Sequence, residues 1–292
     1  MGFWKMLLGG STETPEEEKK SVEAKQFDLL KYDGVKAMRM GQFDYAVKCF
    51  REALKIQEDL EVRDYLSQAL IHQGQLAEAV AELKALHQLA PDNVEVLLQA
   101  AHVAYMQEDY DEMDNLCQQA LAIDETHSRV HYLIAQACVG RGDVIGAIAR
   151  LTKAIVLEPD FADARLLRAQ VLTKMGEVKG AKEDVDWLMA HNADHEDVVL
   201  AAARLAQAAG QSSEALNLYD KLIDMNPFHL EAYHERGRLR YDAGDKKGAE
   251  EDMQKVLELN PNELADVSGD YSAEGVEQHM KRVYSAINPF GL

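Results

Sequence analysis

The chain has 292 residues, of which 47% are hydrophobic and 28% are charged, with a formal net charge of −20. Such an acidic chain is repelled by phosphate backbones, so the composition argues against a nucleic-acid partner and favours a neutral or basic one. The three cysteines are widely spaced and form no CxxC pair, so they suggest neither a disulfide framework nor a zinc knuckle, and we expect a reducing, cytoplasmic location.

The first predicted element is an apolar N-terminal segment and linker over residues 1–13, which begins with MGFWKMLLGG. The apolar run is too short to span a bilayer. Two roles stay open for residues 1–10: docking on protein, including the chain's own groove, or shallow insertion at a membrane surface. A leading helix over 14–26 follows, because the sequence TPEE from Thr14 has the spacing of a capping box with proline at the first helical position.

Prolines and glycines then reveal an internal repeat. Pro91, Pro159, Pro227 and Pro261 are separated by 68, 68 and 34 residues, which are whole multiples of one period. Glycine recurs in the same register at Gly41, Gly74, Gly142, Gly176, Gly210 and Gly244, and Glu108 fills the remaining place. A period of 34 residues predicts stacked helix-turn-helix units that bury their apolar faces on one another.

We expect seven such units, each consisting of a helix, a tight turn, a second helix and a loop. Their boundaries are 27–59, 60–93, 94–127, 128–161, 162–195, 196–229 and 230–263. Glycine suits the tight turn because it adopts a left-handed backbone without steric cost. Five residues later nearly every unit has alanine, as at Ala46 and Ala79, and small residues there let the two helices approach closely.

The closing prolines end the second helix of a unit, because proline cannot continue a helix. The acidic residue after the proline, as at Asp92 and Asp160, is a candidate N-cap for the next helix. A C-terminal capping helix and tail over 264–292 completes the array. Its predicted apolar stripe consists of Val276, Met280, Val283, Tyr284 and Ile287.

The order of small residue, glycine turn, alanine and closing proline resembles the tetratricopeptide repeat family, most clearly in AYHERGRLRYDAGDKKGAEEDMQKVLELNP. The resemblance covers residues 27–263. It implies an all-α fold, a right-handed superhelical solenoid of seven helix-turn-helix repeats with a C-terminal capping helix. It also implies that the first helix of each unit lines the concave face, where partners bind as extended or helical peptides. Members of the family share a shape rather than one chemistry.

The resemblance places the second, fifth, ninth, twelfth and thirteenth residues of each unit on that concave face. From these we expect a peptide-binding set of Leu98, His102, Tyr105, Tyr132, Gln136, Leu166, Gln170, Arg204, Arg238 and Tyr241. Aromatic and Arg side chains often carry binding hot spots, so this mixture suits a protein or peptide ligand with apolar anchors and one or two carboxylates. The alternative role for the tyrosines is packing between neighbouring first helices.

Catalytic and metal motifs are absent from the sequence. The segment GRGDVIG at 140–146 has no preceding strand, as a phosphate-binding loop requires, and the pairs His127 with His131 and His191 with His195 straddle loops without a third ligand. We therefore expect no cofactor, no metal and no enzymatic activity. The sequence favours a non-enzymatic protein–protein interaction scaffold, and the alternative is a membrane-peripheral assembly factor localised by its apolar N-terminus. The oligomeric state stays open.

Overall fold

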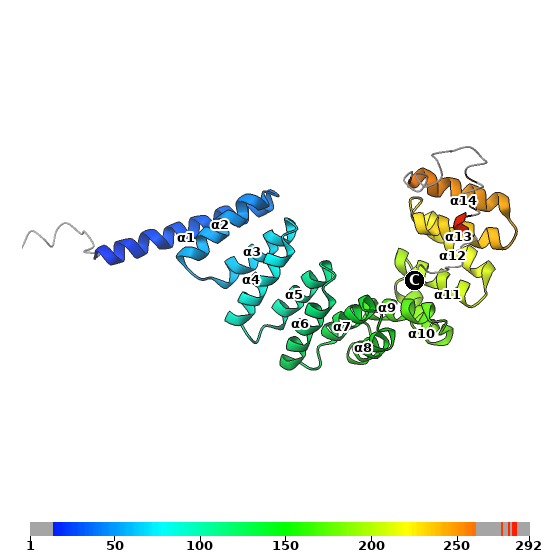
Figure 1. The fold of residues 1–292 in the computed structure, drawn as a ribbon, viewed down its shortest axis with the longest axis horizontal. Helices are drawn as coiled ribbons and strands as arrows, with labels where there is room; N and C mark the ends of the chain where they lie inside the picture. Colours follow the sequence, from blue (N-terminus) through cyan, green and yellow to red (C-terminus); the bar gives the residue numbers. More distant parts are fainter. Residues whose placement is uncertain (1–13, 261–275, 277–279, 281, 285–292) are drawn as a thin grey trace, which may run out of the picture. The chain divides into compact units, whose positions relative to one another are not determined.

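The computed structural model describes residues 14–260, together with residues 276, 280 and 282–284 (Figure 1). Throughout 14–260 the regular structure is α-helical, and consecutive helices pack on each other from α1 to α7 and from α8 to α14. The helices are α1 (Pro15–Arg39), α2 (Phe43–Ile56), α3 (Leu60–His72), α4 (Leu76–Leu89), α5 (Val94–Met106), α6 (Tyr110–Ile123), α7 (Ser128–Gly140), α8 (Val144–Leu157), α9 (Ala162–Lys174), α10 (Val178–His191), α11 (Glu196–Ala208), α12 (Ser212–Met225), α13 (Leu230–Asp242) and α14 (Lys246–Leu259). The all-α, helix-turn-helix fold expected from the sequence is confirmed.

The chain divides into two compact units, Met1–Asp143 and Val144–Leu292. Helices α1 to α7 belong to the first unit and α8 to α14 to the second. Odd-numbered helices are the first helices of the repeats and even-numbered helices are the second ones. The boundaries of the seven repeats stay a proposal. No helix in the described part of the chain has the length and apolar character needed to cross a membrane.

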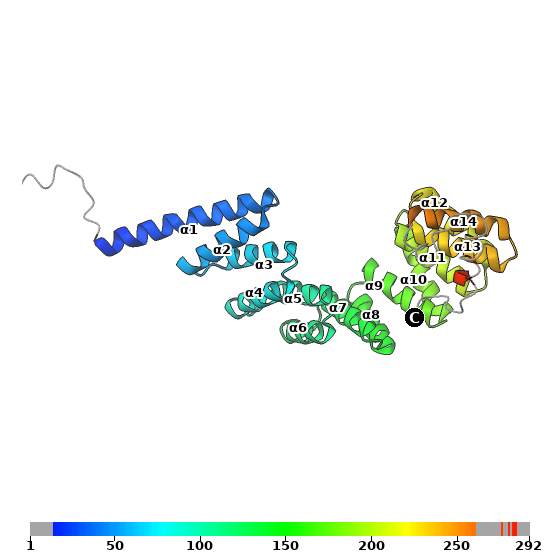
Figure 2. The ribbon, with the colours of Figure 1, turned by 45° about the horizontal axis from the view of Figure 1, so that its top comes forward.

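Helix α1 contains both the predicted leading helix and the first helix of the first repeat. It begins as predicted: Glu17 N donates to Thr14 Oγ1 at 3.3 Å, and Thr14 N donates to Glu17 Oε2 at 2.7 Å, which completes the capping box. The hydrogen bonds from Thr14 lower the pKa of the Glu17 carboxyl. The two predicted helices are continuous because residues 16–33 contain neither glycine nor proline. In Figures 1 and 2 the N-terminal half of α1 extends past the end of α2.

The tight turns between paired helices have the expected left-handed backbone. The glycines of the turn register have φ between 71° and 85°, and Glu108 takes the same conformation with φ of 57°. The alanine register that follows is fully buried, and Met113 is also buried where it replaces alanine. The glycine register therefore predicted the turns correctly.

The N-cap prediction at Asp92 and Asp160 is wrong by one residue. Helix α5 is capped by Asn93, whose Oδ1 accepts from Glu95 N at 3.1 Å, and α9 begins after Phe161, which makes no side-chain cap bond. The reason is that each loop is one residue longer than expected. An N-cap at the residue after proline would start the helices at residues 93 and 161, whereas they start at Val94 and Ala162. Backbone turns rather than acidic caps thus connect these repeats.

The C-terminal stripe packs against the last helix pair. Val276, Met280 and Tyr284 are buried in one cluster with Tyr233 of α13 and Met253 of α14. Val283 lies at the edge of this cluster, whereas Ile287 lies outside the described residues. These side chains thus cover apolar surface of the α13–α14 helix pair, as expected of a capping segment.

Candidate peptide-binding surface

The predicted ligand-contacting residues all lie on first helices. The first unit carries Leu98, His102 and Tyr105 on α5 and Tyr132 and Gln136 on α7. The second unit carries Leu166 and Gln170 on α9, Arg204 on α11, and Arg238 and Tyr241 on α13. Helix α5 contacts α7 and α9 contacts α11, so equivalent side chains on these neighbouring helices form one surface within each unit. We call this surface the inner face.

Helix α5 presents the most exposed part of the inner face. His102 is exposed, and Tyr105 and the adjoining Met106 are 39% and 47% exposed. Leu98 differs, because it is only 4% exposed. Leu98 therefore packs in the core of the helix pair, and we remove it from the ligand-contacting set. The remaining three side chains place an aromatic ring, a flexible thioether and an imidazole on one helix surface.

Tyr105 is supported by a second aromatic ring that the sequence did not predict. The ring centroids of Tyr105 and Tyr110 are 6.2 Å apart with the planes tilted by 59°. Tyr110, from α6, packs over Gly140 at the end of α7, where an added Cβ would lie 2.3 Å from Tyr110 Cζ. Gly140 is therefore required for this packing. The available signal was a glycine outside the turn register, two residues before Gly142.

Helix α7 adds a half-buried polar pair to the inner face. Gln136 Nε2 donates to Tyr132 Oη at 3.2 Å, across one turn of the helix. This hydrogen bond fixes both side chains on the same side of α7. The carbonyl oxygen of the Gln136 amide keeps its capacity to accept a hydrogen bond from a ligand.

Arg204 in the second unit is already held by carboxylates of the same chain. Its Nε donates to Glu235 Oε1 at 2.8 Å and its Nη2 to Glu231 Oε2 at 3.0 Å, both on α13. The hydroxyl of buried Tyr219 donates to Glu235 Oε2 at 2.6 Å, and burial raises the pKa of Tyr219 far above its usual range. The observed role of Arg204 is thus to join α11 to α13.

The other predicted residues of the second unit are half-buried. Leu166 and Gln170 lie on α9, and Arg238 lies on α13. Tyr241 packs against the C-terminal cap, with its ring centroid 5.9 Å from that of Tyr284. The alternative role considered for the tyrosines, packing, therefore describes Tyr241, whereas Tyr105 keeps an exposed ring.

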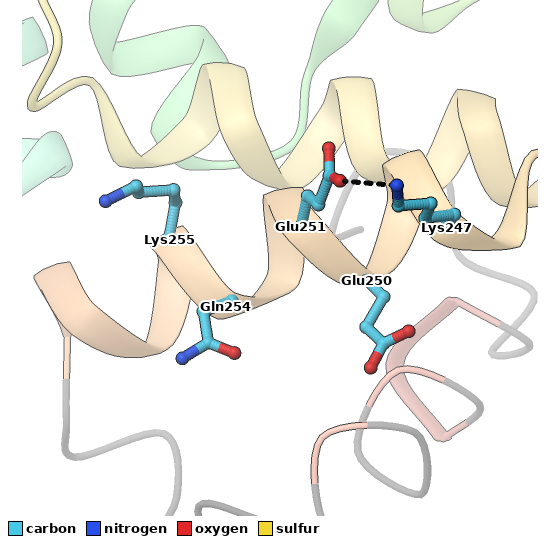
Figure 3. A pocket seen from close by; sticks show the side chains of 5 residues that line it. All are labelled: Lys247, Glu250, Glu251, Gln254 and Lys255. Atoms are coloured by element: carbon cyan, nitrogen blue, oxygen red, sulfur yellow. Dashed lines mark ion pairs between the residues drawn. The ribbon is translucent and has the colours of Figure 1, made fainter. Parts of the chain in front are cut away.

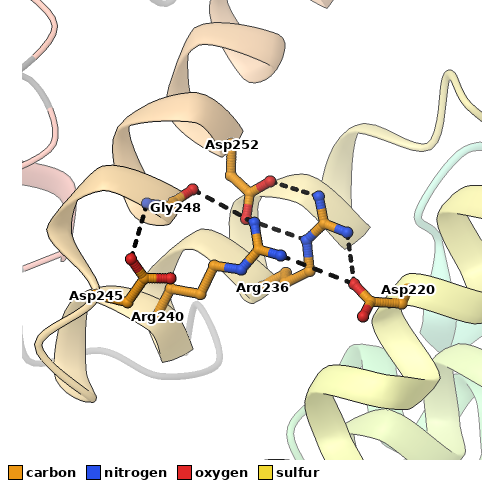
Figure 4. Close-up of polar contacts among 6 residues, drawn as sticks. All are labelled: Asp220, Arg236, Arg240, Asp245, Gly248 and Asp252. Carbon is orange, nitrogen blue, oxygen red and sulfur yellow. Dashed lines mark hydrogen bonds and ion pairs between the residues drawn. The ribbon is translucent and has the colours of Figure 1, made fainter.

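Several arginines of the second unit serve buried carboxylates. Asp252, 2% exposed, accepts from Arg236 Nε at 3.1 Å and from Arg240 Nη1 at 2.9 Å, and Asp220 also accepts from Arg236 (Figure 4). Asp184, fully buried, has the equivalent position on α10.

The carboxylate of Asp184 accepts from Arg165 Nη1 at 3.1 Å and from Arg168 Nε at 2.7 Å. These arginines compensate buried charge, and removing either partner would leave the other uncompensated.

The surface hollow on α14 does not resemble a ligand pocket. It has a volume of 420 Å³ and is lined by Lys247, Glu250, Glu251, Gln254 and Lys255, all on α14 (Figure 3). Small-molecule sites are lined predominantly by apolar and aromatic side chains, and none of the described residues that line this hollow is of that kind. In the part of the chain that the structure describes, no group of three His, Cys, Asp or Glu side chains could hold a metal ion.

The histidines of the two predicted pairs make different contacts. Buried His131 places Nε2 3.2 Å from Glu125 O, whereas His127 Nε2 lies 3.6 Å from Glu95 Oε1. His191 stacks on Trp187 with the ring centroids 4.3 Å apart. His195 Nδ1 lies 3.8 Å from Asp197 Oδ2, so the four histidines have different contacts.

Comparison with known proteins identifies the family. Sequence models described as tetratricopeptide repeats match residues 70–137 in one case and residues 34–94 and 200–263 in another, which together are more than half of the chain. The chain belongs to the tetratricopeptide repeat family. Its exposed inner face is consistent with a fold used for interaction with other proteins.

Individual relatives of this tetratricopeptide repeat protein are distant. DnaJ homolog subfamily C member 3 of Homo sapiens is 24% identical over 135 residues, which are 44% of this chain and 27% of that protein. The Bos taurus protein of the same name is 24% identical over 172 residues, 54% of this chain and 34% of its own length. The chain thus spans roughly a third or less of the curated relatives it matches.

Solved structures of similar fold cover more of the chain. A tetratricopeptide repeat protein from Parabacteroides merdae has a TM-score of 0.68 at 15% identity, covering 89% of this chain and 99% of that one. PilW, a type IV pilus biogenesis factor, has a TM-score of 0.62 at 17% identity, covering 75% and 97%. YrrB, described as a tetratricopeptide repeat protein with an unusual peptide-binding site, has a TM-score of 0.50 at 22% identity, covering 65% and 98%. These likenesses show a shared fold.

Proposed function

We propose that the chain is a non-enzymatic scaffold that holds a peptide or protein segment on the inner face of its first helices. Membership of the tetratricopeptide repeat family supports a role in protein–protein interaction. The observation that carries the inner-face assignment is the exposure of Tyr105 and Met106, because exposed aromatic and Met side chains are enriched where proteins bind one another. The solved structure of YrrB, which is similar in fold, is described as having a peptide-binding site, and this supports a peptide as the kind of ligand.

The first unit offers the better-defined contact surface. Tyr105 is held from behind by Tyr110, so its ring is presented to a ligand at little conformational cost. His102 and the carbonyl oxygen of Gln136 supply hydrogen-bonding groups beside this ring. We therefore propose a ligand with an apolar side chain against Tyr105 and Met106 and with polar groups on either side.

The described arginines change the expected ligand chemistry. Arg204 is paired with two carboxylates, and Arg236 and Arg240 serve Asp252. A ligand carboxylate would have to displace these intramolecular partners. Apolar anchoring therefore replaces carboxylate recognition as the main determinant in our proposal.

The test starts from peptides selected from a displayed random library on the wild-type chain. Dissociation constants of the selected peptides are then measured for wild type and for a Tyr105→Ser, Met106→Ser double variant. We expect binding to weaken by at least about tenfold, since hot-spot side chains typically contribute this much.

The matched control is an Ile123→Ser, Leu89→Ser double variant, because these exposed apolar side chains lie on second helices. The control should bind as wild type does, and both variants should melt close to wild type. Equal affinity of the inner-face variant and wild type would remove the site from α5.

The membrane-peripheral alternative rests on residues 1–10, which lie outside the described residues. No observation in the described helices favours it. The cytoplasmic location likewise stays an expectation from composition.

A further inference from the structure

Helix α8 carries a largely apolar stripe on its solvent-facing side. The stripe consists of Ile145, Ala149, Thr152 and Val156, all exposed, with Ile145 71% and Val156 69% exposed. Their spacing of four, three and four residues places them on one side of the helix. Ala147, Leu151 and Ala154, which are fully buried, form the opposite side. Thr152 Oγ1 accepts a hydrogen bond from Arg168 Nη1 of α9 at 3.0 Å, whereas the apolar members Ile145, Ala149 and Val156 are exposed to solvent.

The other second helices provide an internal comparison at the same registers. In α2 these four places hold Asp44, Lys48, Arg51 and Lys55, all exposed and all charged. By the 34-residue register, α4 has two alanines at these places and none of the other five second helices has more than one apolar side chain, whereas α8 has three, of which Ile145 and Val156 are large. Solvation explains the charged surfaces, and it does not explain the apolar one. Contiguous exposed apolar surface typically marks an interaction site.

The charge of α8 is also unusual. Its sequence, VIGAIARLTKAIVL, contains Arg150 and Lys153 and no carboxylate, whereas every other second helix contains Asp or Glu. Lys153 follows Thr152 at the edge of the stripe, is exposed, and forms no ion pair with the described residues. An apolar stripe with a cation at its edge is thus present on a chain whose net charge is −20.

We propose that the α8 stripe binds an acidic amphipathic helix of a partner protein. Apolar side chains of the partner, spaced by three and four residues, would cover Ile145 and Val156, with small Ala149 between them allowing close approach of the two helices. A carboxylate beside the partner's apolar side chains would pair with Lys153. This surface is separate from the inner face proposed above.

Charge decides against two other occupants. In an antiparallel pair of α8 helices from two copies of the chain, Lys153 of each copy would face the same side, and no carboxylate of either helix would compensate it. The net charge of −20 on each copy adds repulsion. The same net charge opposes an anionic lipid surface. A short acidic helix carries few charges, so the net charge of the chain opposes it less than it opposes a lipid surface or a second copy, and a carboxylate of the helix pairs locally with Lys153.

The test uses the full chain and a fluorescent synthetic helix with leucines spaced alternately by three and four residues and glutamates beside them. A second probe has lysines in place of the glutamates. Anisotropy titrations compare wild type with an Ile145→Lys, Val156→Asp variant. These are the side chains that the chain itself has at the equivalent positions Lys179 and Asp224, so the variant should fold.

The matched control is an Ala77→Lys, Ala122→Asp variant, which makes the same changes at the same registers of α4 and α6. We expect the glutamate probe to bind wild type and control alike and to bind the α8 variant at least about tenfold more weakly. The lysine probe should bind wild type several-fold more weakly than the glutamate probe.

Three results would overturn the proposal. Equal binding of the glutamate probe to the α8 variant would move its site elsewhere, and tighter binding of the lysine probe would reject the acidic partner. Sedimentation showing a dimer of the chain that the α8 variant abolishes would assign the stripe to a second copy. The Tyr105→Ser, Met106→Ser variant should bind the glutamate probe normally, which separates this site from the inner face.

Discussion

Glu108 shows how a single residue responds to the geometry of the repeat. Its backbone is left-handed, its N donates to Tyr105 O at 2.9 Å, and Asp109 N donates to Ala104 O at 3.0 Å. Gly74 makes the same closing bonds in its own turn, from Gly74 N to Ile71 O and from Gln75 N to Leu70 O, both at 2.9 Å. The packing of the helix pair therefore imposes this turn, and glutamate adopts it at a steric cost that glycine avoids.

Glu108→Gly should consequently stabilise the protein. The left-handed conformation destabilises a residue that has a side chain by about 1–2 kcal/mol, and glycine removes this cost. Glycine also makes the unfolded chain more flexible, which offsets part of the effect, so we expect a net stabilisation of about 0.5–1 kcal/mol. Chemical denaturation of both proteins measures the free energy of unfolding. The reverse change, Gly74→Glu, is the control and should destabilise by a similar amount. An unchanged midpoint in both variants would show that these turns carry no strain.

Cys117 illustrates the effect of burial on a single ionisable group. Burial raises the pKa of its thiol to about 12, so almost no thiolate exists at neutral pH. Cys49 and Cys138 are also buried and have raised thiol pKa values. In a Cys49→Ser, Cys138→Ser variant, we expect Cys117 to react with a disulfide reagent at pH 8 at least about a hundredfold more slowly in the folded than in the unfolded protein. Rapid labelling of the folded variant would contradict the burial of Cys117 on α6.

At the scale of helices, close contact between paired helices depends on small residues at defined places. Gly34 of α1 is buried beneath Phe50 of α2, and an added Cβ would lie 2.5 Å from Phe50 Cε1. Phe50 is fully buried and cannot move into solvent. Gly180 of α10 is less restricted, because its added Cβ would meet only the end of the Leu172 side chain, at 3.2 Å from Cδ1.

These two glycines should respond differently to the same substitution. Gly34→Ala should destabilise the protein by about 1–3 kcal/mol, because the extra methyl group overpacks the seam between α1 and α2. Gly180→Ala should be neutral or stabilising by up to about 1 kcal/mol, since alanine favours the helix and Leu172 can adjust. Thermal melts followed by circular dichroism compare the two. A neutral Gly34→Ala variant would show that Phe50 is free to repack.

The order of helices and turns was predictable from the sequence because each depends on residues within one repeat. The glycine register identified the turns, including the one formed by Glu108, and the TPEE sequence identified the start of α1. The surface was less predictable, because depth and pairing depend on residues far apart in the chain. Arg204 is paired with Glu235, 31 residues later, and this pairing cannot be read from a position within one repeat. Leu98 likewise occupies an inner-face register and is nevertheless buried.

At the scale of the whole molecule, acidic charge dominates. The chain has 51 Asp and Glu against 31 Lys and Arg, and many of its ion pairs are exposed, as in Lys182 with Asp186 and Lys247 with Glu251. Exposed pairs of this kind contribute little to stability. Repulsion among the excess carboxylates is spread over the entire surface and opposes folding.

Added salt should therefore stabilise the protein. Raising sodium chloride from about 0.02 M to about 0.5 M shortens the screening length from roughly 20 Å to about 4 Å, which reduces the repulsion more than it weakens the few buried pairs. We expect the melting temperature to rise by several degrees over this range. Sucrose at matched osmolality is the control for general exclusion effects. A falling melting temperature would mean that exposed ion pairs stabilise the folded protein by more than the net charge destabilises it.

The two kinds of arginine contact in the second unit have different consequences for how such an array changes its length during evolution. Asp184 of α10 takes Arg165 and Arg168 from α9, so a duplication of this helix pair would copy the buried carboxylate together with its cations. Arg204 of α11 depends on Glu235 of α13, and an insertion between α12 and α13 would part them. New repeats are therefore expected to be gained after α10 more readily than after α12, and the last two helix pairs should be inherited as one block.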